Sequence, residues 1–328
     1  MPDLKTDETP PGEEERTPMD DIRMKTRGIR KSILIFPGRT NPDPARETAR
    51  RLGVIVGRCR LENFPDGELH VEIQDQVRSR DVYLFQSLVP PAGSSLLELL
   101  FLADACRRGG AGRLTAVIPY CGYARQDHRT GPGEPLSARV IADLLATRFD
   151  RILAVDLHNE SLEGFFPVPL ENVSAVPLLA KALRPCRNSR TVIVAPDLGA
   201  VKLAQRYADL LHLPVVYVHK TRLSGGSVRP RQVIGKVQGQ TPIIVDDMIS
   251  TGETMIAAME ALLELDCRPP FILAASHGLF AGDAVERLSS LPIRGIYISD
   301  SVKRPPAFPL PLRVLSLDRL LAAAIQRL

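Results

Sequence analysis

The sequence predicts an α/β protein made of two similar doubly wound domains, each built on a parallel sheet. Short apolar runs alternate with helix-spaced apolar patterns, and this alternation stops and starts again midway along the 328 residues. Polar turns follow several of the runs, at the carboxyl ends of strands where such sheets bind ligands. We expect a disordered tail over 1–30, a first domain over 31–174 that is completed by 306–328, and a second domain over 175–305.

Composition and charge exclude several classes of protein. The chain carries 42 Lys and Arg against 38 Asp and Glu and has no basic run interleaved with aromatics, so we predict no nucleic-acid partner. It has no apolar run of membrane-spanning length and no secretory signal, which predicts a cytoplasmic protein without a membrane partner. The five cysteines form no C-x-x-C pair, which fits free thiols in a reducing compartment.

The first domain opens with a polar tail and then alternates strands and helices. Residues 1–30 are rich in Pro and charged side chains and have little to bury, which favours disorder. Asp43 and Pro44 suit a helix start, with the carboxylate as cap and the proline at the first helical position. The Asp66-Gly67 pair predicts a hairpin turn. Strands are expected at 32–36, 82–86, 114–118 and 151–155, and helices at 43–52, 95–108 and 137–147.

The second domain repeats the alternation. Its strands are expected at 192–195, 215–218, 242–245, 271–275 and 295–298. Helices are expected to end near Leu211, to span 255–265, and to close the chain at 317–328 with an amphipathic pattern. Because strand and helix alternate throughout, both sheets should be parallel, with helices on their two faces.

The strand at 242–245 leads into a pattern suited to a phosphorylated sugar. Asp246 and Asp247 carry the wrong charge for holding phosphate, but they suit sugar hydroxyls or a divalent cation. Main-chain N–H groups in the next loop can cradle a phosphate at the start of a helix. The loop residues are Ser250, Thr251, Gly252, Glu253 and Thr254. An ordinary helix cap is the alternative interpretation, since Ser and Thr are common caps.

Two further strand ends carry chemistry. Arg125, Gln126 and Asp127 follow two tyrosines, a mixture that offers stacking area, cationic donors and an amide for a purine edge. A solvated turn would explain the polarity but not the mixture. Asp156 and His158 stand two apart at a strand end, so both should point to one side and reach one metal ion or phosphate. A buried histidine with a hydrogen-bond partner is the commoner alternative.

Ten stretches together resemble the ribose-phosphate diphosphokinase (PRPP synthetase) family, in the family's order, from residue 32 onward. They are Gly38 to Pro42, Phe64 to Glu68, Gln86-Ser87, Tyr123 to Asp127, Asp156 to His158, Gly164 to Phe166, Pro196-Asp197, Lys220-x-Arg222, Pro242 to Thr254, and His277-Gly278. The resemblance implies sheets of the type I phosphoribosyltransferase kind. It also implies transfer of the β,γ-diphosphoryl group of ATP to the anomeric hydroxyl of ribose 5-phosphate, giving PRPP and AMP.

The resemblance assigns roles to individual residues. ATP would bind in the first domain at Arg125, Gln126 and Asp127, with Phe64, Asp66 and Glu68 reaching the adenine from a neighbouring subunit. Ribose 5-phosphate would bind in the second domain at Asp246, Asp247 and the loop from Ser250 to Thr254. The catalytic residues would be Lys220, Arg222 and His158, and the Mg²⁺ ligands Asp156, His158 and Asp197. The family also implies Mg²⁺ as cofactor and a homo-oligomer built from dimers, up to a hexamer.

The chain departs from the family pattern at a few places. Gly93-Ser94-Ser95 stands where many members carry Asn-Asp-His, Pro167 stands where an acid often follows Gly-Phe-Phe, and 131–134 lacks the usual basic residues. These differences concern the regulatory ADP site and the hexameric assembly. They also keep open a catalytically silent regulatory paralogue. A phosphoribosyltransferase is a further alternative, although it would leave the first domain unexplained.

Overall fold

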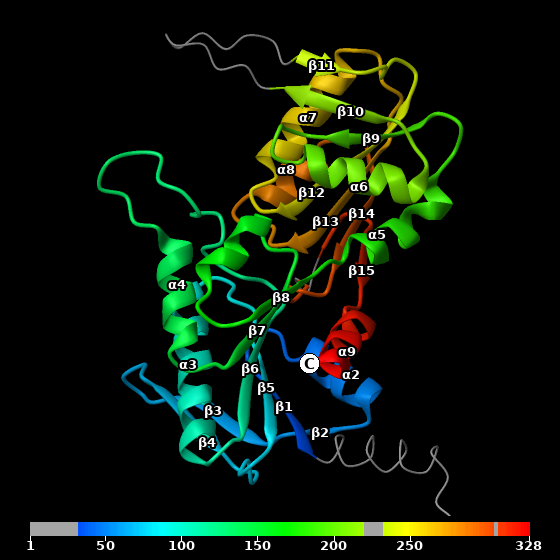
Figure 1. Ribbon diagram of the computed structural model, residues 1–328. Coiled ribbons are helices and arrows are strands. Elements are labelled where there is room, and N and C mark those ends of the chain that lie inside the picture. The colour runs from blue at the N-terminus through cyan, green and yellow to red at the C-terminus, as the bar shows by residue number, and fades with distance from the viewer. Residues whose placement is uncertain (1–31, 220–231, 305–307) are drawn as a thin grey trace, which may run out of the picture.

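The computed structural model describes residues 32–219, 232–304 and 308–328, which form two stacked α/β lobes (Figure 1). The expected disordered tail lies outside these residues. The first lobe holds a parallel sheet of order β2-β1-β5-β6-β7-β8. Its strands are β1 (Ile33–Pro37), β2 (Ile55–Val56), β5 (Asp81–Phe85), β6 (Arg113–Ile118), β7 (Arg151–Val155) and β8 (Leu170–Val173).

The second lobe holds a sheet of order β11-β10-β9-β12-β13-β14-β15. All of its pairings are parallel except that of β10 with β11. Its strands are β9 (Thr191–Ala195), β10 (Val215–His219), β11 (Gln232–Ile234), β12 (Thr241–Ile249), β13 (Phe271–Gly278), β14 (Ile293–Ser299) and β15 (Leu312–Leu315). The two-domain α/β prediction is therefore confirmed, with one antiparallel edge strand added.

Helices cover both faces of each sheet, because neighbouring residues of a buried strand face opposite layers. On the first sheet, α2 (Asp43–Leu52) and α9 (Asp318–Arg327) cover one face, and α3 (Ala92–Arg108) and α4 (Ser137–Ala146) cover the other. On the second sheet, α5 (Val176–Leu183) and α6 (Val201–Leu211) lie opposite α7 (Glu253–Leu263) and α8 (Ala284–Ser289).

Three shorter elements complete the fold. An antiparallel hairpin of β3 (Cys59–Asn63) and β4 (Leu69–Ile73) projects from the first lobe (Figure 1). Two short 3₁₀ helices span Glu160–Phe165 and Arg184–Cys186 in the described residues. The hairpin turn is the predicted one, with Gly67 at φ +95°.

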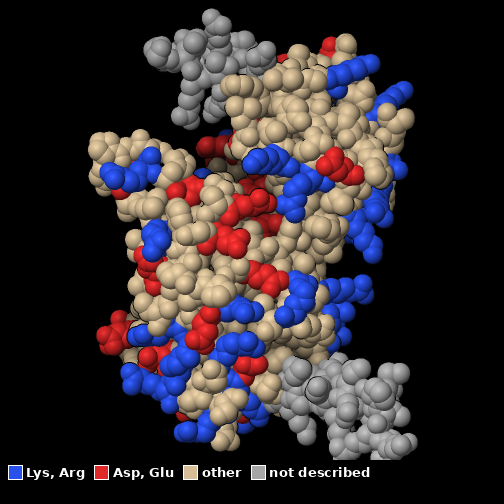
Figure 2. Space-filling view, in the orientation of Figure 1, with Lys and Arg blue, Asp and Glu red and all other residues tan. Residues whose placement is uncertain are grey.

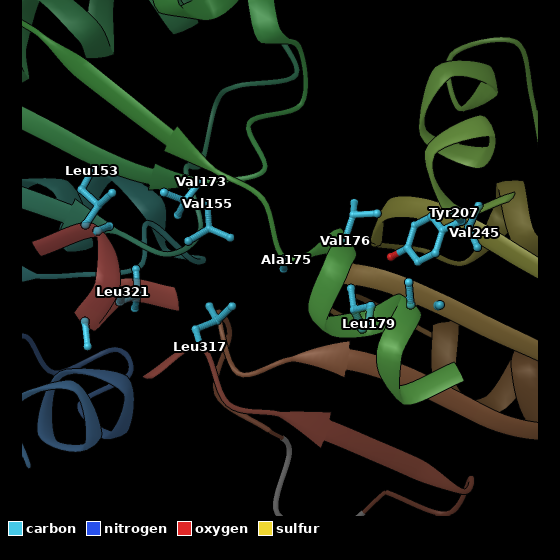
Figure 3. Close-up of a cluster of buried hydrophobic side chains, with 14 of the residues drawn as sticks. Leu153, Val155, Val173, Ala175, Val176, Leu179, Tyr207, Val245, Leu317 and Leu321 are labelled. Carbon is cyan, nitrogen blue, oxygen red and sulfur yellow. The ribbon is translucent and has the colours of Figure 1, made fainter. Parts of the chain in front are cut away.

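One apolar core joins the two lobes (Figure 3). Val155 and Val173 of the first sheet, Leu179 of α5 and Leu321 of α9 belong to the same cluster as Val245 of the second sheet. All five are buried. Because α5 and α9 pack where the lobes meet, the relative position of the two sheets is set by close packing and not by a linker.

The structure corrects several boundaries. β12 continues through Asp246 and Asp247 to Ile249, because β13 pairs alongside it as far as Gly278. Residues 93–95 belong to the first turns of α3 and do not form a loop. Pro42, and not Asp43, occupies the cap position of α2.

The chain also returns to the first lobe later than expected. We expected the return at residue 306, but β15 pairs with β14 in the second sheet. Of the described residues 308–328, α9 alone crosses back, and its Leu321 and Ile325 join the apolar cluster that also contains Ala45 and Ala49 of α2.

Candidate functional site

A cleft of about 1300 Å³ lies between the two lobes and takes its lining from both. The first lobe contributes loops that follow β6 and β7, and the second contributes the ends of β9 and β12 with the start of α7. Acidic side chains gather in the middle of the face shown in Figure 2, between the lobes, with basic ones around them. The cleft exceeds the roughly 300–1,000 Å³ typical of small-ligand pockets, so it has room for two substrates.

Asp246 and Asp247 enter this cleft from the carboxyl-terminal half of β12, where both are half-buried. The Nδ1 atom of His158, from the first lobe, lies 2.6 Å from Oδ2 of Asp247. This contact crosses the cleft and joins the loop after β7 to the second lobe. The structure therefore brings together the predicted ribose-binding acid and the predicted catalytic histidine.

Charge within the cleft shifts the pKa values of these groups. Burial, reinforced by the nearby carboxylates of Asp247 and Asp197, raises the pKa of Asp246 well above its usual value. Burial also opposes ionisation of Asp247, but the hydrogen bond and positive charge of His158 outweigh it and lower the pKa of Asp247. The same hydrogen bond raises the pKa of His158. Asp247 and His158 are therefore best described as an ion pair.

This ion pair predicts a specific pH dependence. Because the folded-state pKa of His158 is raised, the pair stabilises the fold fully below pH about 6.5 and loses this effect as pH rises through the raised value. The lowered pKa of Asp247 means that stabilisation is also lost at low pH, as pH falls through that value. We expect the NMR titration midpoint of His158 to lie above that of a model histidine and to fall in Asp247→Asn. An unchanged midpoint in this variant would contradict the pairing.

The predicted phosphate loop opens onto the cleft at the start of α7. All five of its predicted residues, Ser250 to Thr254, line the cleft. Gly252 precedes the helix with φ +75°, a backbone conformation that favours glycine. The free N–H groups of the first helical turn therefore lie at the cleft, which suits an anion.

The predicted nucleotide residues separate into two groups. Arg125 and Asp127 line the cleft, and Asp127 accepts a hydrogen bond from the side-chain amide of Asn159 at 2.9 Å. Gln126 is exposed and is not among the lining residues, and its main-chain N–H donates to the carbonyl of Tyr123. Neighbours in sequence thus face different ways because the chain turns here.

Phe64, Asp66 and Glu68 lie at the exposed tip of the β3–β4 hairpin and do not line this chain's own cleft. Figure 1 shows the hairpin at the opposite end of the first lobe from the second lobe. Asp66 uses a carboxylate oxygen to accept a hydrogen bond from the N–H of Glu68 at 3.1 Å. In this chain its visible role is to close the turn.

Asp156 differs from the expectation that it would share an orientation with His158. Its φ of +37° is left-handed, so the alternation of an extended strand ends at Val155. Its carboxylate accepts hydrogen bonds from the N–H of Ala175 and the hydroxyl of Ser276, whereas His158 pairs with Asp247. Asp156 still lines the cleft, but it and His158 are held by different partners.

Asp197 lines the cleft after β9 and accepts hydrogen bonds from the N–H groups of Gly199 and Ala200. Within the described part of the chain, no three His, Cys, Asp or Glu side chains are grouped tightly enough to hold a metal by themselves. Mg²⁺ does not require such a cage, since it binds through one or two carboxylates plus substrate phosphates and water. The dispersed carboxylates of this cleft fit that mode.

Several polar residues of the cleft were not predicted from the sequence, among them Asn159, Lys202 and Arg206. Lys202 and Arg206 lie one helical turn apart on α6, and Arg206 reaches Glu160 of the first lobe at 3.7 Å. The sequence could have predicted both residues, because α6 begins directly after the Pro196-Asp197 turn, at the carboxyl end of a strand where ligands bind.

Lys220 and Arg222 lie in 220–231, outside the described residues.

Among the helices of the described ranges, none combines the length and the apolar character needed to span a bilayer.

Comparisons with known proteins find relatives of both lobes. Residues 33–148 match the model of the N-terminal domain of ribose phosphate pyrophosphokinase, and residues 176–296 match the phosphoribosyl transferase domain. Ribose-phosphate pyrophosphokinase from Chromobacterium violaceum is 38% identical over 90% of this chain and 92% of its own. The enzyme from Gloeobacter violaceus is 39% identical, with 90% of each chain covered.

A solved structure agrees as well. The crystal structure of phosphoribosylpyrophosphate synthetase from Mycobacterium smegmatis aligns with a TM-score of 0.83 at 37% identity, covering 90% of this chain and 98% of that one. The match therefore extends across both lobes and not only across one domain.

Proposed function

This chain belongs to the ribose-phosphate pyrophosphokinase family, and we propose that it carries out the family's reaction in the cleft between its lobes. It transfers the β,γ-diphosphoryl group of ATP to the anomeric hydroxyl of ribose 5-phosphate, giving PRPP and AMP. One observation carries the assignment of the site. A single cleft collects Arg125, Asp127 and His158 from the first lobe and Asp246, Asp247 and the phosphate loop from the second.

Ribose 5-phosphate binds on the side of the second lobe. Its 5-phosphate accepts hydrogen bonds from main-chain N–H groups at the start of α7, where the helix dipole favours an anion. Its ring hydroxyls donate to Asp246 and Asp247, which are side by side on β12. This arrangement selects a sugar phosphate. The helix start suits the phosphate but not the sugar hydroxyls, and the two aspartates suit the hydroxyls but repel the phosphate.

ATP binds on the side of the first lobe and requires Mg²⁺. The described lining of the cleft holds seven Asp or Glu side chains but only three Lys or Arg. Such a lining repels a bare triphosphate, so a divalent cation must mediate its binding. We assign Asp156, His158 and Asp197 to the region of the metal-bound phosphates, and Arg125 and Asp127 to the nucleotide. Held there, Mg²⁺ would supply positive charge to offset the charge that develops on the transferred group.

The transfer itself forms a bond between the anomeric oxygen and the β-phosphorus. It breaks the bond from that phosphorus to the oxygen linking it to the α-phosphate, so AMP leaves with that oxygen and the proton of the anomeric hydroxyl is released to solvent. Because Asp247 holds Nδ1 of His158, the other ring nitrogen is left to contact the reacting phosphates. Lys220 and Arg222 supply further positive charge in this proposal. Positioning and charge stabilisation do most of the work in phosphoryl transfer.

Neither alternative function is favoured. A phosphoribosyltransferase would leave the first lobe without a role, yet residues 33–148 match the pyrophosphokinase model. A silent regulatory paralogue was suggested by the departures at 93–95 and Pro167. These residues are not among those that line the cleft.

An AMP-formation assay tests the proposed function. Purified protein, ATP, Mg²⁺ and ribose 5-phosphate should yield AMP and PRPP in equal amounts, and omission of Mg²⁺ or of ribose 5-phosphate should abolish both. Absence of AMP at every phosphate concentration tried would reject the enzyme and favour the silent paralogue. Release of diphosphate from PRPP that depends on a nucleobase would instead support the transferase.

We also propose that the chain works as a homo-oligomer. The hairpin carrying Phe64 does not reach this chain's own cleft, so its predicted contact with adenine requires a second copy. Large apolar side chains are exposed on two helices that cover the same face of the first sheet, α3 and α4. They are Leu97, Phe101, Val140 and Leu144.

We expect Phe101→Glu to lower the molar mass measured by light scattering to that of a smaller assembly, because a charge cannot be buried in an apolar contact. Leu210→Glu, at a similarly exposed position on α6, should leave the mass unchanged. Phe101 and Leu210 are 41% and 39% exposed, so the pair is matched. A wild-type mass equal to that of one chain would refute the oligomer.

A further inference from the structure

His277 lies beneath the cleft, outside the groups that the proposed chemistry uses. It belongs to β13, is 2% exposed, and its ring packs edge-on to Tyr120 of the first lobe. Both ring nitrogens have partners. Nδ1 lies 2.8 Å from the hydroxyl of Ser301, and Nε2 lies 3.1 Å from the main-chain carbonyl oxygen of Asp156.

The hydrogen bond to Asp156 fixes the role of Nε2. A carbonyl oxygen can only accept, so Nε2 of His277 carries a proton and donates it. Nδ1 contacts the Ser301 hydroxyl, which is also within hydrogen-bond distance of the Ser276 carbonyl at 3.2 Å. A buried imidazole with both nitrogens satisfied holds one orientation, because any rotation would leave a polar group unpaired.

The carbonyl that accepts this hydrogen bond belongs to Asp156, whose backbone conformation is left-handed. Asp156 has φ +37°, a conformation that is unfavourable for a residue other than glycine and persists only when its surroundings enforce it. Ser276, next to His277, binds the carboxylate of the same residue. The second lobe thus holds Asp156 at two points, one on the side chain and one on the main chain.

Because the second lobe holds Asp156 in place, it also determines the position of His158. Only Leu157 separates them, and its N–H is bound by the side chain of Asn172. β13 also pairs directly with β12, with Met248 opposite His277, so the same two strands carry His277 and the partner of His158, Asp247. The distance from His158 to Asp247 is therefore set by a short and rigid route.

We propose that His277 is a positioning residue of the active site. By donating Nε2–H to the Asp156 carbonyl, it holds the loop after β7 so that His158 meets Asp247 across the cleft. His277 touches no substrate and acts only through His158. The inference rests on the proposed function for its kinetic test, and on the fold alone for its structural test.

The kinetic test is a double-mutant cycle. His277→Leu keeps the size of the side chain but removes the donor, and should lower kcat about 10-fold or more, since a displacement of about 1 Å can cost up to 10²-fold. KM for ATP should stay within roughly twofold of wild type, because the lost interaction acts in the transition state. In a His158→Ala background, His277→Leu should cost almost nothing further.

Two more variants separate positioning from general destabilisation. His277→Gln retains an N–H donor at a similar reach and should restore most of kcat. Thr191→Val removes a hydrogen bond from an equally buried side chain, the one accepted from the N–H of Asn188, at the end of β9 away from the cleft, and should leave kcat near wild type. Losses that multiply in the His158→Ala background, or an equal loss in Thr191→Val, would overturn the proposal.

The structural test needs no activity. In a crystal structure of His277→Leu, the separation of His158 Nδ1 and Asp247 Oδ2 should exceed that of the wild-type protein determined in the same way. An unchanged separation would overturn the proposal even if kcat falls. An inactive wild-type protein would defeat the proposed function, but this comparison would still decide the role of His277.

Discussion

Replacing Asp247 with Asn is expected to lower kcat by about 10²–10³-fold, the usual loss when one preorganised electrostatic group is removed from an active site. Asp247 holds His158 at 2.6 Å and belongs to the acidic pair that we assign to the ribose. Asparagine keeps the size of the side chain but loses the charge. It therefore loosens His158 and removes charge that offsets the cation. Initial rates of AMP formation at saturating ATP and ribose 5-phosphate measure the loss.

The control is Glu47→Gln, which also removes one carboxylate charge. Glu47 lies on α2, outside the cleft, and pairs with Arg50 at 2.6 Å on the surface. Exposed pairs of this kind contribute little, so activity should stay within error of wild type. If Asp247→Asn retained more than about a tenth of wild-type kcat, an order of magnitude above the expected range, the assignment of the acidic pair would fail.

Replacing Leu321 with Ala is expected to lower the free energy of unfolding by about 2–5 kcal/mol, the range for a leucine truncated in a packed core. Leu321 of α9 is completely buried in the cluster that joins both lobes, near Leu317 and Val155 (Figure 3). The chain has no Trp, so urea unfolding is best followed by circular dichroism. Because one core serves both sheets, a single transition should move to lower urea.

Leu210→Ala provides the comparison, since Leu210 is 39% exposed and a surface change of this kind usually stays within about 0.5 kcal/mol. Two well-separated transitions in the wild-type protein would show that the lobes unfold independently. That result would contradict the role we give to the shared core.

The sequence predicted site residues correctly where a short motif determines the local backbone conformation. The loop from Ser250 to Thr254 follows a strand and precedes a helix, and Gly252 takes the left-handed conformation. Its place at the cleft follows from the rule that parallel strands present their carboxyl ends at one edge. Local pattern was sufficient there because the relevant contacts lie within a few residues.

Local pattern failed where a distant contact overrides it. Alternation along an extended strand predicted that Asp156 and His158 would act together, but contacts from Ala175, Ser276 and His277 hold Asp156 in a left-handed conformation. Gln126 likewise turns away from its neighbours Arg125 and Asp127. No periodicity in the sequence encodes these departures.

By itself the sequence determined the two-lobed α/β architecture and the residue types that follow each strand, because hydrophobic periodicity and turn residues act locally. Only the tertiary structure decided which of those residues meet. The contact between His158 and Asp247, the support of His277 beneath Asp156 and the core that fixes one lobe against the other all join residues far apart in the chain. Such contacts depend on how two sheets pack, and packing is a property of the whole fold.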